Sequence, residues 1–147
     1  MDLTDAIILR FEIETLLMDY WHEVDTNNGR KAHEFFLQDG LFRNSVGRDR
    51  IGRDAIAEFY SSRDARGPRI ARHVSTNLRV LAPNGSDVTS NYILLLFAAD
   101  GVPVLPSEPP IMIADVTDVC RRDSDGRWRY ASRMIVGLFK GDKPTTT

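Results

Sequence analysis

The feature that most constrains this fold is a change in hydrophobic period after Gly67-Pro68. Before that step, apolar residues recur mostly at spacings of three and four, the pattern of amphipathic helices. After it, the chain changes to long strand-like runs, over residues 70–81, 87–99, 111–122 and 128–139. The Asn84-Gly85 step marks a hairpin between the first two runs. Helices followed by antiparallel strands predict an α+β domain with the helices gathered on one face of the sheet.

Three helices are expected before this step, over residues 3–24, 30–37 and 52–62. The first has Thr4 or Asp5 as its N-cap, and Asn27-Asn28-Gly29 stops it. Gly40 ends the second helix, and residues 41–46 are expected to form a short strand or turn.

We expect the sheet to curve around the helices as a cone-shaped roll. Its three N-terminal helices would pack in the concave face of a mainly antiparallel sheet and leave an apolar cavity, the default binding site. Residues 1–140 would form a single domain and residues 141–147 a flexible tail. Both faces of the run at 128–139 are partly apolar, which favours a homodimer or a higher homo-oligomer through the outer face of the sheet.

Composition argues against several classes of protein. The net charge is −2, and although sixteen of the nineteen basic residues are arginine, acidic residues lie among them. A nucleic-acid surface would need a sustained basic face. No apolar run approaches the ~20 residues of a membrane span, and the acidic N-terminus lacks the features of a signal peptide. Cys120, the single cysteine, is expected to be a buried reduced thiol, which favours a cytoplasmic protein.

His73 is the best candidate for a catalytic group. It lies near the start of a strand-like segment, where an aliphatic residue would be usual. Upstream, Asp25 puts a carboxylate at the end of the first helix, where an apolar stripe meets a turn. An imidazole paired with a carboxylate is a suitable general base, because the carboxylate fixes the tautomer and stabilises the imidazolium. The alternative is a histidine satisfied by the backbone and a carboxylate that bonds nearby amides.

Strict strand alternation would set His73 opposite the main apolar face of its own strand. We therefore expect a β-bulge near Ser75 to Asn77, which would let His73 and the later aliphatic residues both face inward.

Asp118 is a second candidate carboxylate. Alternation puts it on one strand face with Met112, Ala114, Val116 and Cys120. If that face lines the cavity, desolvation would raise the pKa of Asp118 and could keep it neutral, as a hydrogen-bond donor or proton shuttle. Alternatively, the face packs on a second subunit, where Asp118 pairs with an arginine.

The remaining candidates would contact a small hydrophobic substrate. They are Tyr20, Trp21, Phe59, Tyr60, Asn91, Met112 and Met134. Core packing is the alternative for the aromatic members. No metal site is expected, because His22 and His33 lack partners at ligand spacing, and no cofactor is expected, since the chain has no glycine-rich phosphate loop of the right spacing.

Several segments resemble the SnoaL-like branch of the nuclear transport factor 2-like superfamily, from Ile13 to about Phe139. They are residues 20–25, 35–40, 52–56 with Phe59, 72–73 with 76–77, and 125–129. The resemblance implies a cone fold. It leaves the reaction open, because members include dehydratases, isomerases, cyclases, epoxide hydrolases, small subunits of ring-hydroxylating dioxygenases and proteins without catalysis.

Within that family, Asp25 and His73 match the Asp-His pair with which scytalone dehydratase-like enzymes remove a proton. Their second pocket histidine has no counterpart here, so the resemblance implies that Asn91 or Tyr92 would serve instead.

Ketosteroid isomerases offer a second comparison. Tyr20 resembles their oxyanion-binding tyrosine, and Asp118 falls near their neutral aspartic acid. Asn44 stands where their catalytic base would be, which disfavours that particular isomerisation.

The sequence thus predicts a cofactor-free lyase or isomerase that acts on a small, mostly apolar cyclic substrate. His73 would abstract the proton, Asp25 would orient it, and Tyr20 with Asp118 would bond the substrate's oxygen. The alternative is a binding protein without catalysis, or a small structural subunit like that of ring-hydroxylating dioxygenases.

Overall fold

The computed structural model describes residues 1–44 and 49–145. In chain order it contains α1 (Leu3–Thr26), the 3-10 helix η1 (Ala32–Phe35), β1 (Phe36–Asn44), β2 (Arg50–Ile51), α2 (Arg53–Ser61), the 3-10 helix η2 (Asp64–Arg66), β3 (Arg69–Val80), β4 (Asp87–Asp100), β5 (Met112–Arg122) and β6 (Trp128–Lys140). The six strands form one mixed sheet in the order β2-β1-β6-β5-β4-β3. Among the described residues, β1 and β6 form the only parallel pair of strands, and the other four pairs are antiparallel.

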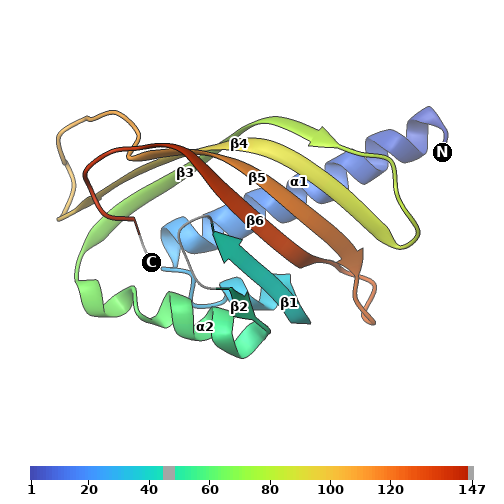
Figure 1. The fold of residues 1–147 in the computed structure, drawn as a ribbon, viewed down its shortest axis with the longest axis horizontal. Helices are drawn as coiled ribbons and strands as arrows, with labels where there is room; N and C mark the ends of the chain where they lie inside the picture. The colour runs from blue at the N-terminus through green and yellow to red at the C-terminus, as the bar shows by residue number, and fades with distance from the viewer. Residues whose placement is uncertain (45–48, 146–147) are drawn as a thin grey trace.

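The sheet curves, and α1 runs along one of its faces while α2 lies at one end beside β1 and β2 (Figure 1). The buried face of α1, with Ile13, Leu17 and Tyr20, packs against inward side chains of the strands in one apolar cluster. The Asp2 carboxylate caps α1 by accepting from the Asp5 N–H at 2.8 Å, so the N-cap is Asp2 and not the expected Thr4 or Asp5. The α+β class and the curved sheet therefore agree with the sequence-based expectation.

The helix expected over residues 30–37 is instead a single 3-10 turn, followed by β1 from Phe36. So short a segment gains little as an isolated helix. As a strand it pairs with β6 and buries Phe36 completely. Gly40, expected to end that helix, lies within β1, where an added Cβ would come within 3.0 Å of the Tyr130 carbonyl oxygen. The expected strand or turn at 41–46 is part of β1 up to Asn44, and its last two residues lie outside the described part of the chain.

The β-bulge expected in β3 is present. The register with β4 shifts between Thr76 and Arg79, and Asn77 has a φ of 57°. Ala71 and His73 face inward before the shift, and Leu78 packs against the core after it. The bulge therefore lets one strand turn both His73 and its later aliphatic residues toward the helices.

The outer face of the sheet carries partly exposed apolar side chains. They are Val74, Phe97, Met134, Val136 and Leu138. Association of two or more copies through this face stays a prediction. None of the helices within residues 1–44 and 49–145 is long and apolar enough to cross a membrane.

Candidate active site

Asp25 and His73 meet across the interface between α1 and β3. Asp25 lies in the last turn of α1, which ends at Thr26, and His73 is the fifth residue of β3. His73 Nδ1 lies 2.6 Å from Asp25 Oδ1, and the His73 backbone N–H donates to Asp25 Oδ2 at 2.8 Å. A carboxylate only accepts, so Nδ1 carries the hydrogen in this pair. The free nitrogen of the neutral ring is then Nε2.

The surroundings of this pair are largely dry. The side chains of His73 and Asp25 are only 9% and 8% exposed. The Trp21 indole stacks on the imidazole with a centroid distance of 4.0 Å and an interplanar angle of 10°. Burial lowers the pKa of His73, the hydrogen bond and charge of Asp25 oppose that fall, and the charges of Arg63 and Arg133 add to it. His73 is therefore neutral at neutral pH and can accept a proton.

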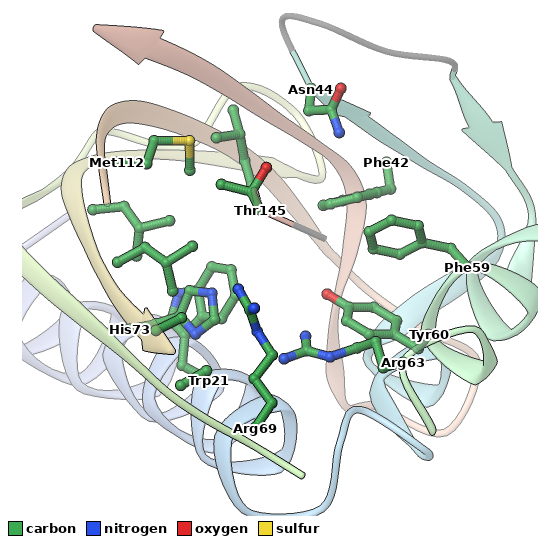
Figure 2. Close-up of a pocket in the computed structure, with 15 residues that line it drawn as sticks. Trp21, Phe42, Asn44, Phe59, Tyr60, Arg63, Arg69, His73, Met112 and Thr145 are labelled. Carbon is green, nitrogen blue, oxygen red and sulfur yellow. The ribbon is translucent and has the colours of Figure 1, made fainter. Parts of the chain in front are cut away.

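The imidazole faces a pocket between the sheet and α2 (Figure 2). The space between its walls, open mouth included, is about 690 Å³. Apolar side chains make most of the wall: Phe42, Phe59, Leu94, Leu96, Met112 and Ile135. The polar side chains that line the pocket are Asn44, Tyr60, Arg63, Arg69, His73 and Thr145. Such a pocket suits an apolar molecule that carries a few polar groups.

Four of the substrate-contacting residues expected from the sequence line this pocket, namely Trp21, Phe59, Tyr60 and Met112. Tyr20 lies one layer deeper. It is fully buried, its hydroxyl bonds the Tyr60 hydroxyl, and it does not line the pocket. Burial raises the pKa of Tyr60 well above its usual value, so this phenol stays protonated. Tyr60 therefore presents the phenol to the pocket, and Tyr20 supports it from behind.

Asp118 forms a buried ion pair inside the chain and does not line the pocket. Arg133 Nε and Nη2 donate to its two carboxylate oxygens at 2.8 and 2.7 Å, and both side chains are almost completely buried. Burial raises the pKa of Asp118, and the Arg133 charge and hydrogen bonds oppose that rise. This two-point geometry is that of a carboxylate held by a guanidinium. The rise in pKa and the arginine partner agree with the sequence-based expectation. The expected places were wrong, because Asp118 does not line the cavity and its partner belongs to the same chain.

Aromatic rings enclose the Arg133 guanidinium. Its Cζ lies 4.2 Å from the ring centroids of Tyr20 and Tyr130 and 4.9 Å from that of Trp21. The cation–π contacts join the ion pair to the ring that stacks on His73. Asp118 and Arg133 thus form the support beneath the pocket.

Two expected pocket residues lie on the outer face of the sheet. Asn91 donates to Thr117 Oγ1 at 2.9 Å, because the inward positions of β4 are the even-numbered ones, which turn Tyr92 to the core. Met134 is 42% exposed. Under strict alternation, Met134 would lie on the same strand face as the buried Tyr130. A register shift in β6 between Tyr130 and Ser132 reverses the faces and turns Met134 outward.

Sequence reasoning missed Asn44, Arg63 and Arg69, all of which line the pocket. A signal existed for Arg69, because it shares strand parity with Ala71 and His73. Arg63 follows the end of α2 in a turn, where no periodicity predicts the direction of a side chain. For Asn44, the sequence offers only its position where ketosteroid isomerases carry their base.

The chain beyond β6 contacts the pocket. Gly141 donates to the Ile111 carbonyl oxygen, Pro144 accepts from Arg69, and Thr145 lines the pocket. Flexibility of this tail stays a prediction. Within the described ranges, no group of three or more histidine, cysteine, aspartate or glutamate side chains is arranged to hold a metal ion.

A curved sheet backed by a helix, with an Asp-His pair facing an apolar pocket, is the arrangement of a cone-shaped α+β fold. Residues 5–134 match the model of the SnoaL-like domain family. The chain belongs to this family, the SnoaL-like branch of the nuclear transport factor 2-like superfamily. A search of curated proteins finds no match.

Solved structures give the same fold. A Catenulispora acidiphila protein in complex with S-DNPA is 27% identical, with a TM-score of 0.76, over 89% of this chain and 94% of the other. ActVI-ORFA from Streptomyces coelicolor is 20% identical, with a TM-score of 0.77, over 88% and 96% of the two chains. A proposed scytalone dehydratase from Novosphingobium aromaticivorans is 17% identical, with a TM-score of 0.81, over 97% and 93%.

Proposed function

We propose that this protein is a cofactor-free lyase or isomerase of dehydratase type that removes a proton from a small, largely apolar cyclic substrate. The observation that carries the proposal is the Asp25–His73 pair, whose imidazole lines an otherwise mainly apolar pocket. The SnoaL-like family and the likeness to a proposed scytalone dehydratase support the reaction class.

His73 is the base in this proposal. Its Nδ1–H remains hydrogen-bonded to the Asp25 carboxylate. Its Nε2 takes a proton from a carbon next to the substrate's carbonyl group. The electron pair of the broken C–H bond moves toward the carbonyl oxygen, and the Asp25 carboxylate stabilises the imidazolium that forms. In a dehydration, a hydroxyl on the neighbouring carbon leaves with that proton as water and a C=C bond forms. In an isomerisation, the proton returns to another carbon.

Tyr60 is the proposed donor to the substrate's oxygen. Its hydroxyl is protonated, since burial raises its pKa, and it lies on the pocket wall. The Tyr20 hydroxyl can donate to it from behind, which leaves the Tyr60 proton free to point into the pocket. This replaces Tyr20 by Tyr60 in the role expected from the sequence, and it gives Asp118 no contact with substrate.

A simple substrate tests the reaction. 3-Hydroxy-1-tetralone loses water to form 1-naphthol, and its exchangeable C–H protons can be followed by NMR in D₂O. We expect the wild-type protein to accelerate exchange or dehydration, and His73→Gln to lose roughly 10²–10⁴-fold of that rate. Asp19→Asn, an exposed carboxylate on the same helix as Asp25, is the control and should keep the rate.

Two results would count against the proposal. His73→Gln with the wild-type rate would exclude this base. Tight binding of such a ketone by the wild type, without exchange or dehydration, would favour the binding protein without catalysis.

A further inference from the structure

Two arginine side chains line the apolar pocket next to His73. Arg69 begins β3 and Arg63 follows α2, and their guanidinium groups lie side by side between His73 and Tyr60 (Figure 2). They also act on each other, since burial lowers the pKa of Arg63 and the charge of Arg69 contributes to that fall. Two like charges in a pocket of low polarity repel, and that repulsion is relieved when an anion enters.

The partners that these arginines have inside the protein do not satisfy them. Arg69 is only 11% exposed, and its Nη1 reaches Asp100 at 3.1 Å, a carboxylate that is itself 64% exposed. Its Nη2 donates to the Pro144 carbonyl oxygen at 3.1 Å, and its buried Nε has no hydrogen-bond partner. A buried donor without an acceptor costs free energy unless a ligand supplies that acceptor.

Arg63 is less compensated than Arg69. Its guanidinium carbon lies 5.7 Å from the centroid of the Tyr60 ring. Among the described residues, no carboxylate lies within ion-pair distance of it. The Asp25 carboxylate attracts it from a distance, but both oxygens of Asp25 are already engaged by His73.

We propose that the substrate carries a carboxylate, and that Arg63 and Arg69 bind it beside His73. This inference rests on the proposed function, because it names the substrate class of the same pocket. Guanidinium groups bind carboxylates through paired N–H donors in one plane. The Nε–H of Arg69, which has no acceptor, and the Arg63 guanidinium, which has no carboxylate partner, suit such binding. The carbon skeleton of the substrate would then lie against the apolar wall that includes Leu96 and Met112.

The carboxylate would also tune the base. The charge of Arg63 lowers the pKa of His73, so an anion bound to Arg63 offsets that effect and raises the pKa. Substrate binding would therefore make His73 a stronger base only when a carboxylate is present.

Binding of matched acids and amides tests this proposal. Calorimetry would compare benzoate with benzamide and 2-naphthoate with 2-naphthamide, which differ in charge but little in shape. We expect at least one acid to bind about tenfold or more tightly than its amide, given the strength of charged hydrogen bonds. Arg63→Gln and Arg69→Gln should each lose this preference. Arg79→Gln, which removes an exposed charge from the same strand as Arg69 but outside the pocket, should keep it.

An NMR pH titration of His73 tests whether the acid binds beside this residue. The acid should raise the pKa of His73 in the wild type, and the amide should not. An unfolding midpoint in urea close to that of the wild type would show that each arginine variant is folded. Arg63→Lys should recover part of the preference because it restores the charge.

Several outcomes would overturn the inference. They are an acid that binds no more tightly than its amide, a preference that survives in both arginine variants, and inorganic phosphate that binds as tightly as the aromatic acids. The His73→Gln variant separates this inference from the proposed function, since it should lose proton transfer and keep the preference for acids. A wild type that prefers acids but moves no proton would refute the reaction and leave the carboxylate site standing.

Discussion

The carboxylate of Asp25 holds both the ring and the backbone of His73, with one oxygen on Nδ1 at 2.6 Å and the other on the backbone N–H at 2.8 Å. One side chain at the end of α1 thus fixes the tautomer of the imidazole and the position of β3 at the same point. Coupling between the two residues is therefore built into the way helix and sheet pack.

Replacing Asp25 by Asn should lower the pKa of His73 further. Asp25 is the group that raises this pKa against the effect of burial, and a neutral amide supplies less stabilisation of the imidazolium. The measurement is an NMR pH titration of the His73 ring in the wild type and the variant, with Asp19→Asn as the control. An unchanged pKa in Asp25→Asn would mean that the two side chains are not coupled in solution.

The stability of the protein should fall as the pH is lowered through the pKa of folded His73. Burial puts this pKa below the ordinary value of 6.5, so the unfolded chain binds a proton more readily than the folded one. The contribution is fully present above pH 6.5 and is lost below it. Urea unfolding of the wild type and His73→Gln across this range should show a weaker pH dependence in the variant. His22→Gln, at an exposed helix position, should behave like the wild type.

Breaking the Asp118–Arg133 pair should be strongly destabilising. Asp118→Asn leaves the buried Arg133 cation without its anion, and such losses are about 3–5 kcal/mol in the free energy of unfolding. The double variant Asp118→Leu with Arg133→Met should lose less than the single change, since no charge is left unpaired. Denaturant unfolding measures both. A double variant less stable than Asp118→Asn would show that the ion pair contributes more to the free energy of unfolding than the mutual neutralisation of its two charges.

The exposed pair of Arg121 and Asp87 is the comparison for that experiment. It also joins two neighbouring strands, β4 and β5, but at the surface. Asp87→Asn should leave the free energy of unfolding nearly unchanged, because water screens exposed ion pairs.

Gly29→Ala should destabilise the protein and disturb the pocket. Gly29 has a φ of +70°, and an added Cβ would overlap the Tyr60 ring. Gly67 has a φ of +81° but no atom within 4 Å of the added Cβ. Gly67→Ala should therefore lose about 1 kcal/mol from backbone strain alone, and Gly29→Ala about 1–3 kcal/mol more from overpacking. Equal losses in unfolding experiments would contradict this account of Tyr60.

Local patterns determined the main elements of this fold. The spacing of apolar residues gave α1, α2 and the four long strands, because burial of one face imposes a period on a helix or strand. The segment at 30–37 was the exception. Its conformation depends on pairing with β6, a strand nearly a hundred residues later, and the same holds for the close approach at Gly40.

The Asp25–His73 pair could be anticipated because each residue interrupts a local pattern, and the bulge at Asn77 follows from the need to bury both ends of β3. Other parts of the site depended on tertiary structure. A bulge in β6 turned Met134 outward, and the partner of Asp118 was decided by which strands are neighbours.

Long side chains were the least predictable. Arg63 is one of sixteen arginines, and nothing in its local sequence separates it from the surface majority. For Arg69, strand parity with Ala71 and His73 was the one signal. A flexible side chain can reach toward solvent or into a pocket, and only the three-dimensional position of its backbone decides between the two. The sequence therefore determined most of the elements and the pairing of Asp25 with His73, while the tertiary structure decided which charged side chains surround that imidazole.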